Sequence, residues 1–235
     1  MKCKVISLEG IWGAGKSTLS KSLACSLKNV GYKVSFIHYG IRANIGKLLE
    51  QELDFVNPVR VKTGKGGFER DYHAFIEILL RYAREYYDQQ HFITPQFAAN
   101  DIIILDRGID TITAYALAIL HSTYSEKSMD EWYEWIKNTT GFWSCESPDL
   151  TIFLSLDWEY AVQRAEKRDK TDYGLERKTF LPMYVNAFEY IAQREERIVT
   201  IDINEKKREW VLEAALKIIS NHLNHEVFGE KIKIS

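Results

Sequence analysis

The chain has 235 residues, of which 46% are hydrophobic and 27% charged, and its formal net charge at pH 7 is -2. This length favours one domain, residues 1–235, over two full domains. A charge so close to zero gives no basic footprint for a nucleic-acid polymer, and no apolar run reaches the about eighteen residues of a membrane span.

The three cysteines, Cys3, Cys25 and Cys145, are odd in number and far apart in the sequence. They lack the C-x-x-C spacing of a thiolate zinc site, and an odd number argues against a disulfide framework. The first residues run straight into a strand-like segment without a signal-peptide pattern. Together these features favour a reducing, cytoplasmic compartment.

The segment VISLEGIWGAGKST, from Val5 to Thr18, joins a buried-strand pattern to a glycine-rich turn and the start of a helix. The turn fits G-x-x-x-x-G-K-[ST], the spacing of a phosphate-binding loop, and its flanking strand and helix are the context that this motif requires. Lys16 is expected to neutralise the β- and γ-phosphates of ATP, and the Ser17 hydroxyl to bind Mg²⁺. The residues expected to hold the nucleotide are Gly10, Gly13, Ala14, Gly15, Lys16, Ser17 and Thr18.

Strand-like and helix-like segments alternate along the chain. Strands are predicted at Val5–Leu8, Lys33–Tyr39, Ile102–Asp106, Leu150–Leu156 and Ile198–Ile203. Helices are predicted at Lys16–Val30, Asn44–Glu52, Asp71–His91, Thr111–His121, Met129–Thr140, Trp158–Arg168, Leu175–Arg194 and Glu205–Leu223. This order predicts an α/β fold of the P-loop NTPase type, a doubly wound five-stranded parallel sheet flanked by helices.

Two of these helices carry apolar stripes that are expected to face the core. In the helix from Asp71 to His91, the stripe consists of Phe75, Leu79, Tyr82 or Ala83, and Tyr86. In the last helix, the stripe consists of Trp210, Val211, Ala214, Ala215, Ile218 and Ile219.

Charged residues follow two further predicted elements. Asp106 and Arg107 come directly after a strand that reads as buried on both faces. The aspartate could orient Mg²⁺ through water, and the arginine could hold an acceptor phosphate through two parallel hydrogen bonds. Arg164 and Arg168 lie four residues apart on one helical face, just before the polar segment 169–174. This segment is the candidate lid loop, which would carry both arginines over the triphosphate as it closes.

Taken together, these segments resemble the thymidylate kinase family, one of the P-loop nucleoside monophosphate kinases. The resemblance runs from about residue 3 to about residue 220. It rests on VISLEGIWGAGKST (5–18), ILLRYAREYY (78–87), DRGIDTITAYA (106–116), PDLTIFLSLDWEYAVQRAEKR (148–168) and LERKTF (175–180). It implies transfer of the γ-phosphoryl group of ATP to a nucleoside monophosphate, foremost dTMP.

The resemblance also implies roles for individual residues. Arg107 would contact the acceptor phosphate, assisted by Arg81 or Arg84, and Arg164 and Arg168 would belong to the lid. Catalysis is thus assigned to Lys16, Arg107, Arg164 and Arg168, and the metal site to Ser17 and Asp106. The residues assigned to the acceptor site are Glu9, Trp12, Arg81, Arg84, Asp106, Arg107, Thr111 and Tyr115.

The chain departs from the family's usual pattern at several positions. Trp12 stands where family members place an acid that contacts the 3'-hydroxyl of the acceptor sugar, and Tyr173-Gly174-Leu175-Glu176 lacks one arginine of the lid string. An indole cannot accept a hydrogen bond from that hydroxyl. Either the enzyme tolerates changes at the 3' position, or Trp12 packs as core on the helix of Arg81 and Arg84.

Two other functions stay open on the sequence alone. A deoxynucleoside kinase would use Glu9 or Asp106 as a general base toward a 5'-hydroxyl, although such enzymes resemble E-R-S where this chain has Asp106-Arg107-Gly108. A non-catalytic nucleotide-binding protein would account for the missing acid and the missing lid arginine. A GTPase is disfavoured because no N-K-x-D string fits. The expected partners are small nucleotides, and a homodimer is left open.

Overall fold

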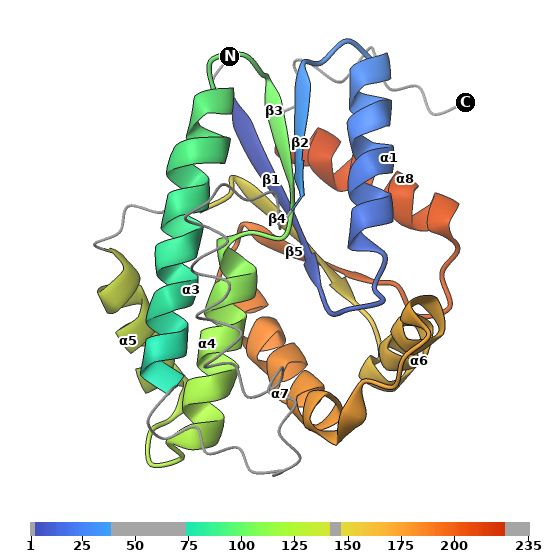
Figure 1. Cartoon of the computed structure of the whole chain (residues 1–235). Helices are drawn as coiled ribbons and strands as arrows, with labels where there is room; N and C mark the ends of the chain where they lie inside the picture. The colour runs from blue at the N-terminus through green and yellow to red at the C-terminus, as the bar shows by residue number, and fades with distance from the viewer. Residues whose placement is uncertain (1–2, 39–73, 142–146, 224–235) are drawn as a thin grey trace.

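The computed structural model describes residues 3–38, 74–141 and 147–223 (Figure 1). Within them, parallel strands form one five-stranded sheet in the order β2-β3-β1-β4-β5. The strands are β1 (Lys4–Gly10), β2 (Val34–His38), β3 (Ile102–Asp106), β4 (Leu150–Ser155) and β5 (Ile198–Asp202). The five predicted strands and the doubly wound α/β architecture are therefore confirmed.

Helices cover both faces of the sheet. Helices α1 (Lys16–Asn29) and α8 (Arg208–His222) pack together on one face, and α3 (Ala74–Asp88), α4 (Ile109–Thr123) and α7 (Gly174–Ala192) lie on the other (Figure 1). Helix α5 (Met129–Thr140) packs on α4, and α6 (Trp158–Asp169) contacts α7. A π-helix at Gln89–Ile93 and a 3-10 turn at Thr94–Gln96 follow α3. The helix predicted at 44–52 lies outside the described residues. Among the described helices, none combines the length and apolar character that a membrane span requires.

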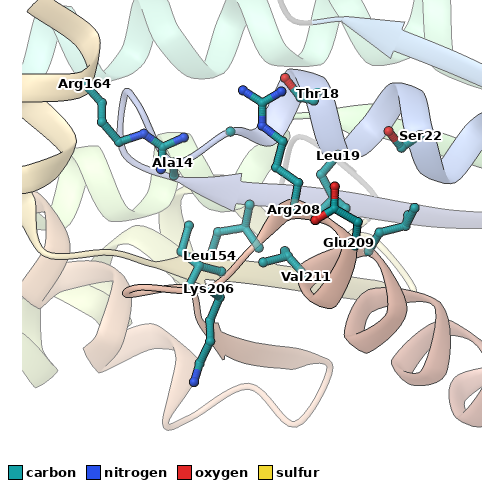
Figure 2. A pocket seen from close by; sticks show the side chains of 13 residues that line it. Ala14, Thr18, Leu19, Ser22, Leu154, Arg164, Lys206, Arg208, Glu209 and Val211 are labelled. Atoms are coloured by element: carbon teal, nitrogen blue, oxygen red, sulfur yellow. The ribbon is translucent and has the colours of Figure 1, made fainter.

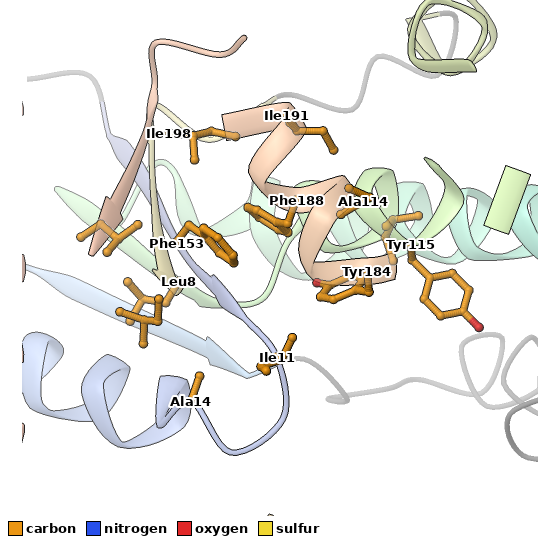
Figure 3. Packing of buried hydrophobic residues seen from close by; sticks show 14 of the residues in the cluster. Leu8, Ile11, Ala14, Ala114, Tyr115, Phe153, Tyr184, Phe188, Ile191 and Ile198 are labelled. Carbon is orange, nitrogen blue, oxygen red and sulfur yellow. The ribbon is translucent and has the colours of Figure 1, made fainter. Parts of the chain in front are cut away.

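The core lies between the central strands and the helices on each face. Strand β3 is buried along its whole length, as its unbroken apolar run predicts. On β4, the ring of Phe153 stacks on Phe188 of α7 with 4.2 Å between ring centroids (Figure 3). Fully burying a side chain of this kind contributes about 1.5–3 kcal/mol. This packing gives the loops at the edge of the sheet a rigid base.

The strand register brings two predicted site segments side by side. Leu8 of β1 pairs with Asp106 of β3, so the loop after Gly10 and the residues after Asp106 leave the same edge of the sheet. The chain runs from β1 to β2 on one side and from β3 to β4 on the other. The crevice between β1 and β3 is therefore the switch point, where sheets of this kind bind ligands.

The predicted apolar stripe of α3 is confirmed at Tyr82, which is buried, and at Phe75, which packs against the core, but it is wrong at the two other positions. Leu79 and Tyr86 are 43% and 39% exposed, whereas Glu77 and Arg84 are buried. The buried side of this helix carries polar as well as apolar residues, so hydrophobic periodicity identifies it only in part. The stripe of α8 is wrong at one position, because Trp210 is 46% exposed.

Candidate active site

The loop between β1 and α1, residues 10–17, is the phosphate loop. Its glycines Gly10, Gly13 and Gly15 have φ angles of 141°, 86° and 90°. A Cβ atom at Gly13 would lie 2.3 Å from the carbonyl oxygen of Ala161 on α6, so only glycine fits there. The loop ends at the N-terminus of α1, where backbone N–H groups and the helix dipole favour a phosphate.

Positive charge converges on this loop. Lys16 is only 6% exposed, and its Nζ donates a hydrogen bond to the backbone oxygen of Ile11 at 2.8 Å. Burial lowers the pKa of Lys16 well below its ordinary value, and the charges of Arg107 and Arg168 lower it further, against the opposing effect of Asp106 and nearby Glu9. Cations from the phosphate loop, the β3 end and α6 thus lie near enough for their charges to act on one another, which favours a multiply charged anion.

Glu9 connects β1 to the start of α4. Its carboxylate is fully buried and accepts hydrogen bonds from the backbone N–H of Gly108, at 2.7 Å, and from the hydroxyl of Thr111. Burial and the charge of Asp110 raise the pKa of Glu9 to about 7, while the hydrogen bond from Thr111 and the charge of Arg107 oppose this rise. Thr111 Oγ1 also accepts a hydrogen bond from Arg107 Nη1 at 3.3 Å. Glu9 therefore braces the residue that holds Arg107.

The residues that end β3 are held in an unusual conformation. Arg107 has a φ of 77°, in the left-handed region that side-chain-bearing residues rarely adopt, and its N–H donates to the backbone oxygen of Leu8 at 3.1 Å. Asp106 is 1% exposed, and its Oδ2 lies 2.8 Å from Nδ1 of His38 on β2. Backbone strain of this kind clusters at functional sites, where the surrounding structure maintains it.

Arg81 and Arg84 have different surroundings. The guanidinium carbon of Arg81 lies 3.9 Å from the centroid of the Tyr115 ring on α4, and its Nη2 donates to Glu77 Oε1 at 2.7 Å. Burial acts to lower the pKa of Arg81, but Tyr115 and Glu77 raise it above its ordinary value. Arg84 is 2% exposed, its pKa is lowered by burial, and the charge that most opposes this is that of Glu85. Arg81 is thus the arginine in contact with the predicted acceptor residue Tyr115.

The candidate lid is shorter than predicted. Asp169 ends α6 and Gly174 begins α7, which leaves residues 170–173 as the connection. Arg168 donates from Nε and Nη2 to the carboxylate of Asp169 at 2.6 and 2.8 Å. Trp12 is 37% exposed and meets Tyr173 edge-on, with 6.5 Å between ring centroids. Trp12 is therefore not a core residue packed on α3, which was one of the two alternatives.

A cavity of about 300 Å³ extends from the phosphate loop between α1, α6 and α8 (Figure 2). Arg164 of α6 and Arg208 of α8 line it, and both reach toward the phosphate loop in Figure 2. The other lining residues include polar Thr18 and Ser22 and the apolar side chains of Leu19, Leu154 and Val211. Its size suits the nucleoside part of a nucleotide.

Sequence reasoning missed two residues of the site. Arg208 follows β5 and begins α8, so its place near the carboxyl edge of the sheet was a usable signal. Glu77 lies one helical turn before Arg81, a spacing typical of ion pairs.

Ser17 and Asp106 form a donor set that suits Mg²⁺. Ser17 is exposed beside the phosphate loop, and Asp106 ends the neighbouring strand β3. Hydroxyl and carboxylate oxygens are hard ligands, and Mg²⁺ often completes its shell with phosphate oxygens and water. The parts of the chain that the structure describes hold no group of three or more His, Cys, Asp or Glu side chains able to bind a metal. This chemistry fits a metal that arrives with the nucleotide.

Known proteins extend this picture. The family model for thymidylate kinase matches residues 8–214. The chain belongs to the thymidylate kinase family. A relative named a probable thymidylate kinase, from Archaeoglobus fulgidus, is 27% identical over 94% of this chain and 96% of its own length. The thymidylate kinase of Halothermothrix orenii is 28% identical over 99% and 100%.

Solved structures of thymidylate kinases have a fold similar to that of this chain. The structure of thymidylate kinase from Candida albicans matches with a TM-score of 0.65 and 22% identity, over 96% of this chain and 94% of that one. At this identity the match supports the shared fold alone. Membership of the family rests on the family model. The family model and the structural match both support the P-loop NTPase architecture predicted from the sequence.

Proposed function

We propose that this protein transfers the γ-phosphoryl group of ATP to dTMP and releases ADP and the nucleoside diphosphate. The observation that carries the proposal is the convergence of Lys16, Arg107 and Arg168 on the phosphate loop, where their charges act on one another. Phosphoryl transfer depends mostly on positioning and on neutralising phosphate charge, which is what this arrangement supplies. Family membership points to dTMP as the acceptor, and a cytoplasmic location, predicted from the cysteines, belongs to the same proposal.

On the donor side, the glycine-rich backbone and Lys16 hold the β- and γ-phosphates of ATP. Thr18, which lines the cavity, contacts the phosphate nearest the nucleoside, and Arg164 and Arg208 flank the rest of the donor. When bound by Ser17 and by Asp106 through water, Mg²⁺ supplies further neutralisation of the phosphate charge.

On the acceptor side, Arg107 holds the monophosphate of dTMP. Thr111 and Glu9 fix the direction of its guanidinium through the hydrogen bonds described above. Arg81 provides the second cation, oriented by Glu77 and stacked on Tyr115, and we assign it this role in preference to Arg84. A planar guanidinium held at one edge keeps its remaining donors available for phosphate oxygens.

A coupled assay of ADP release tests the function, with ATP and Mg²⁺ and either dTMP or thymidine as acceptor. We expect turnover with dTMP and none with thymidine. Turnover with thymidine alone would identify a deoxynucleoside kinase, and ATP binding without any turnover would identify a non-catalytic protein. No contact in the described site favours either of these alternatives.

A prediction about acceptor specificity follows from Trp12, which cannot accept a hydrogen bond from the 3'-hydroxyl of the sugar. We expect the wild type to turn over 3'-modified dTMP nearly as well as dTMP. A site that makes no hydrogen bond to the 3'-hydroxyl does not discriminate against an acceptor that lacks it. Trp12→Asp should restore discrimination. The ratio of kcat/KM for the two acceptors measures the effect in each protein. This interpretation of Trp12 would be contradicted if the wild type rejected the modified acceptor and Trp12→Asp left the ratio of the two kcat/KM values unchanged.

Arg208 provides a prediction for the donor side. Arg208→Ala should raise the KM for ATP about tenfold, the lower end of what a hydrogen bond to a charged group contributes, because its guanidinium is exposed. The KM for dTMP should not change. Lys217→Ala is a matched control, since Lys217 is an exposed cation on the same helix. An equal rise in both KM values would show that Arg208 acts on the fold and not on the donor.

A further inference from the structure

The connection between α6 and α7 is tied to the phosphate loop through aromatic rings. Tyr173 presents its ring to Trp12, the two planes meeting at 78°. Its backbone N–H donates to Glu166 Oε1 at 3.0 Å, and its hydroxyl donates to Asp169 Oδ2. Tyr173 is thus held from α6 and at the same time links the phosphate loop to Asp169.

Asp169 in turn holds the lid arginine. Both of its carboxylate oxygens accept from Arg168, at 2.6 Å from Nε and 2.8 Å from Nη2. The hydrogen bonds that Arg168 donates to Asp169 raise the pKa of Arg168 above its ordinary value. A guanidinium has five N–H donors, so this paired edge leaves the other edge available for phosphate oxygens.

The held arginine lies near enough to the phosphate loop for its charge to act on Lys16. The charge of Arg168 contributes to the lowered pKa of Lys16 in the phosphate loop. Yet the side chain of Arg168 is 61% exposed, and an unrestrained arginine at such a position would sample many rotamers.

We infer that Asp169 is a positioning residue for phosphoryl transfer, which aims Arg168 at the transferred group, and that Tyr173, seated on Trp12, holds Asp169 in place. The inference rests on the proposed function, because only a kinase needs an arginine fixed over the phosphates. It predicts that Asp169 acts on the reaction through Arg168 and by no other route.

The test combines Asp169→Asn with Arg168→Ala in a double-mutant cycle, with kcat and both KM values measured for ATP and dTMP. Asp169→Asn should lower kcat roughly ten- to a hundredfold, the scale expected when a positioned group is misplaced, and leave both KM values nearly unchanged. In the Arg168→Ala background the same change should have no further effect, because coupled residues are not additive.

Two matched variants sharpen the test. Tyr173→Phe removes only the hydroxyl that reaches Asp169. Its kcat should fall by less than that of Asp169→Asn, and again only when Arg168 is present. Glu159→Gln changes an exposed carboxylate on the same helix as Asp169, outside the connection, and kcat should stay the same. If Asp169→Asn fails to fold, a double-mutant cycle of Tyr173→Phe with Arg168→Ala provides the same comparison.

Several outcomes would overturn the inference. A rise in kcat for Asp169→Asn would mean that the pair restrains Arg168, and an equal fall with and without Arg168 would mean that Asp169 acts independently. A wild type that shows no turnover of dTMP would contradict the proposed function instead, so the two failures are distinguishable.

Discussion

Lys16→Ala is expected to lower kcat for phosphoryl transfer by about a hundredfold or more, the cost of removing a preorganised group that stabilises transition-state charge. Lys16 is buried, and its Nζ donates a hydrogen bond of 2.8 Å to the carbonyl oxygen of Ile11. Both residues belong to the loop that would surround the phosphates. A bound triphosphate offers that ammonium a charged partner in place of a backbone carbonyl. The measurement is kcat for dTMP at saturating ATP and Mg²⁺.

Stability measurements separate this effect from unfolding. Because the folded pKa of Lys16 lies below its unfolded value, the folded chain disfavours the charged side chain at neutral pH, and removing that charge should not destabilise the fold. Lys16→Met keeps most of the aliphatic stem and should melt at a temperature no lower than the wild type. Lys21→Ala, an exposed lysine on the same helix, should retain full activity. Near-native turnover in Lys16→Ala would contradict the kinase assignment.

Local rules were sufficient to predict most elements of the fold. Strand β3 was predicted to the residue because a parallel strand buried on both faces must be a continuous apolar run. Helix α5 was also predicted to the residue, and Ser128 and Glu131 form a capping box at its start. The phosphate loop was predictable because its glycines are required by backbone angles and by close approach, which are properties of the local chain.

Contacts between distant segments were not predictable in this way. Helix α3 buries Glu77 and Arg84, so its hydrophobic pattern pointed to the exposed residues Leu79 and Tyr86. Trp12 has a partner in Tyr173, which lies far along the chain, and no periodicity relates the two. Positioning groups are satisfied by tertiary contacts and not by local propensity, so sequence rules are expected to fail most often at functional sites.

The acceptor subsite gives the second large prediction, that Arg107→Ala raises the KM for dTMP far more than the KM for ATP. Truncating one partner of a buried charge pair costs roughly 2 to 5 kcal/mol, or about thirty- to several-thousandfold in KM. Arg107 follows β3, opposite the phosphate loop across the switch point, and Thr111 holds its Nη1 at 3.3 Å.

Further variants at Arg107 separate the effect of its charge from the effects of its guanidinium geometry and of its backbone conformation. Arg107→Lys should recover only part of the loss, because an ammonium cannot make two parallel hydrogen bonds to a phosphate. Arg107→Gly should raise the KM for dTMP as much as Arg107→Ala does but be more stable to unfolding, since glycine adopts a φ of 77° without strain. Arg194→Ala, a surface arginine paired with Asp130, should change neither KM. If Arg107→Ala raised both KM values equally, the donor and acceptor sides would be wrongly divided between β1 and β3, because a residue that serves one phosphate site must leave the other intact.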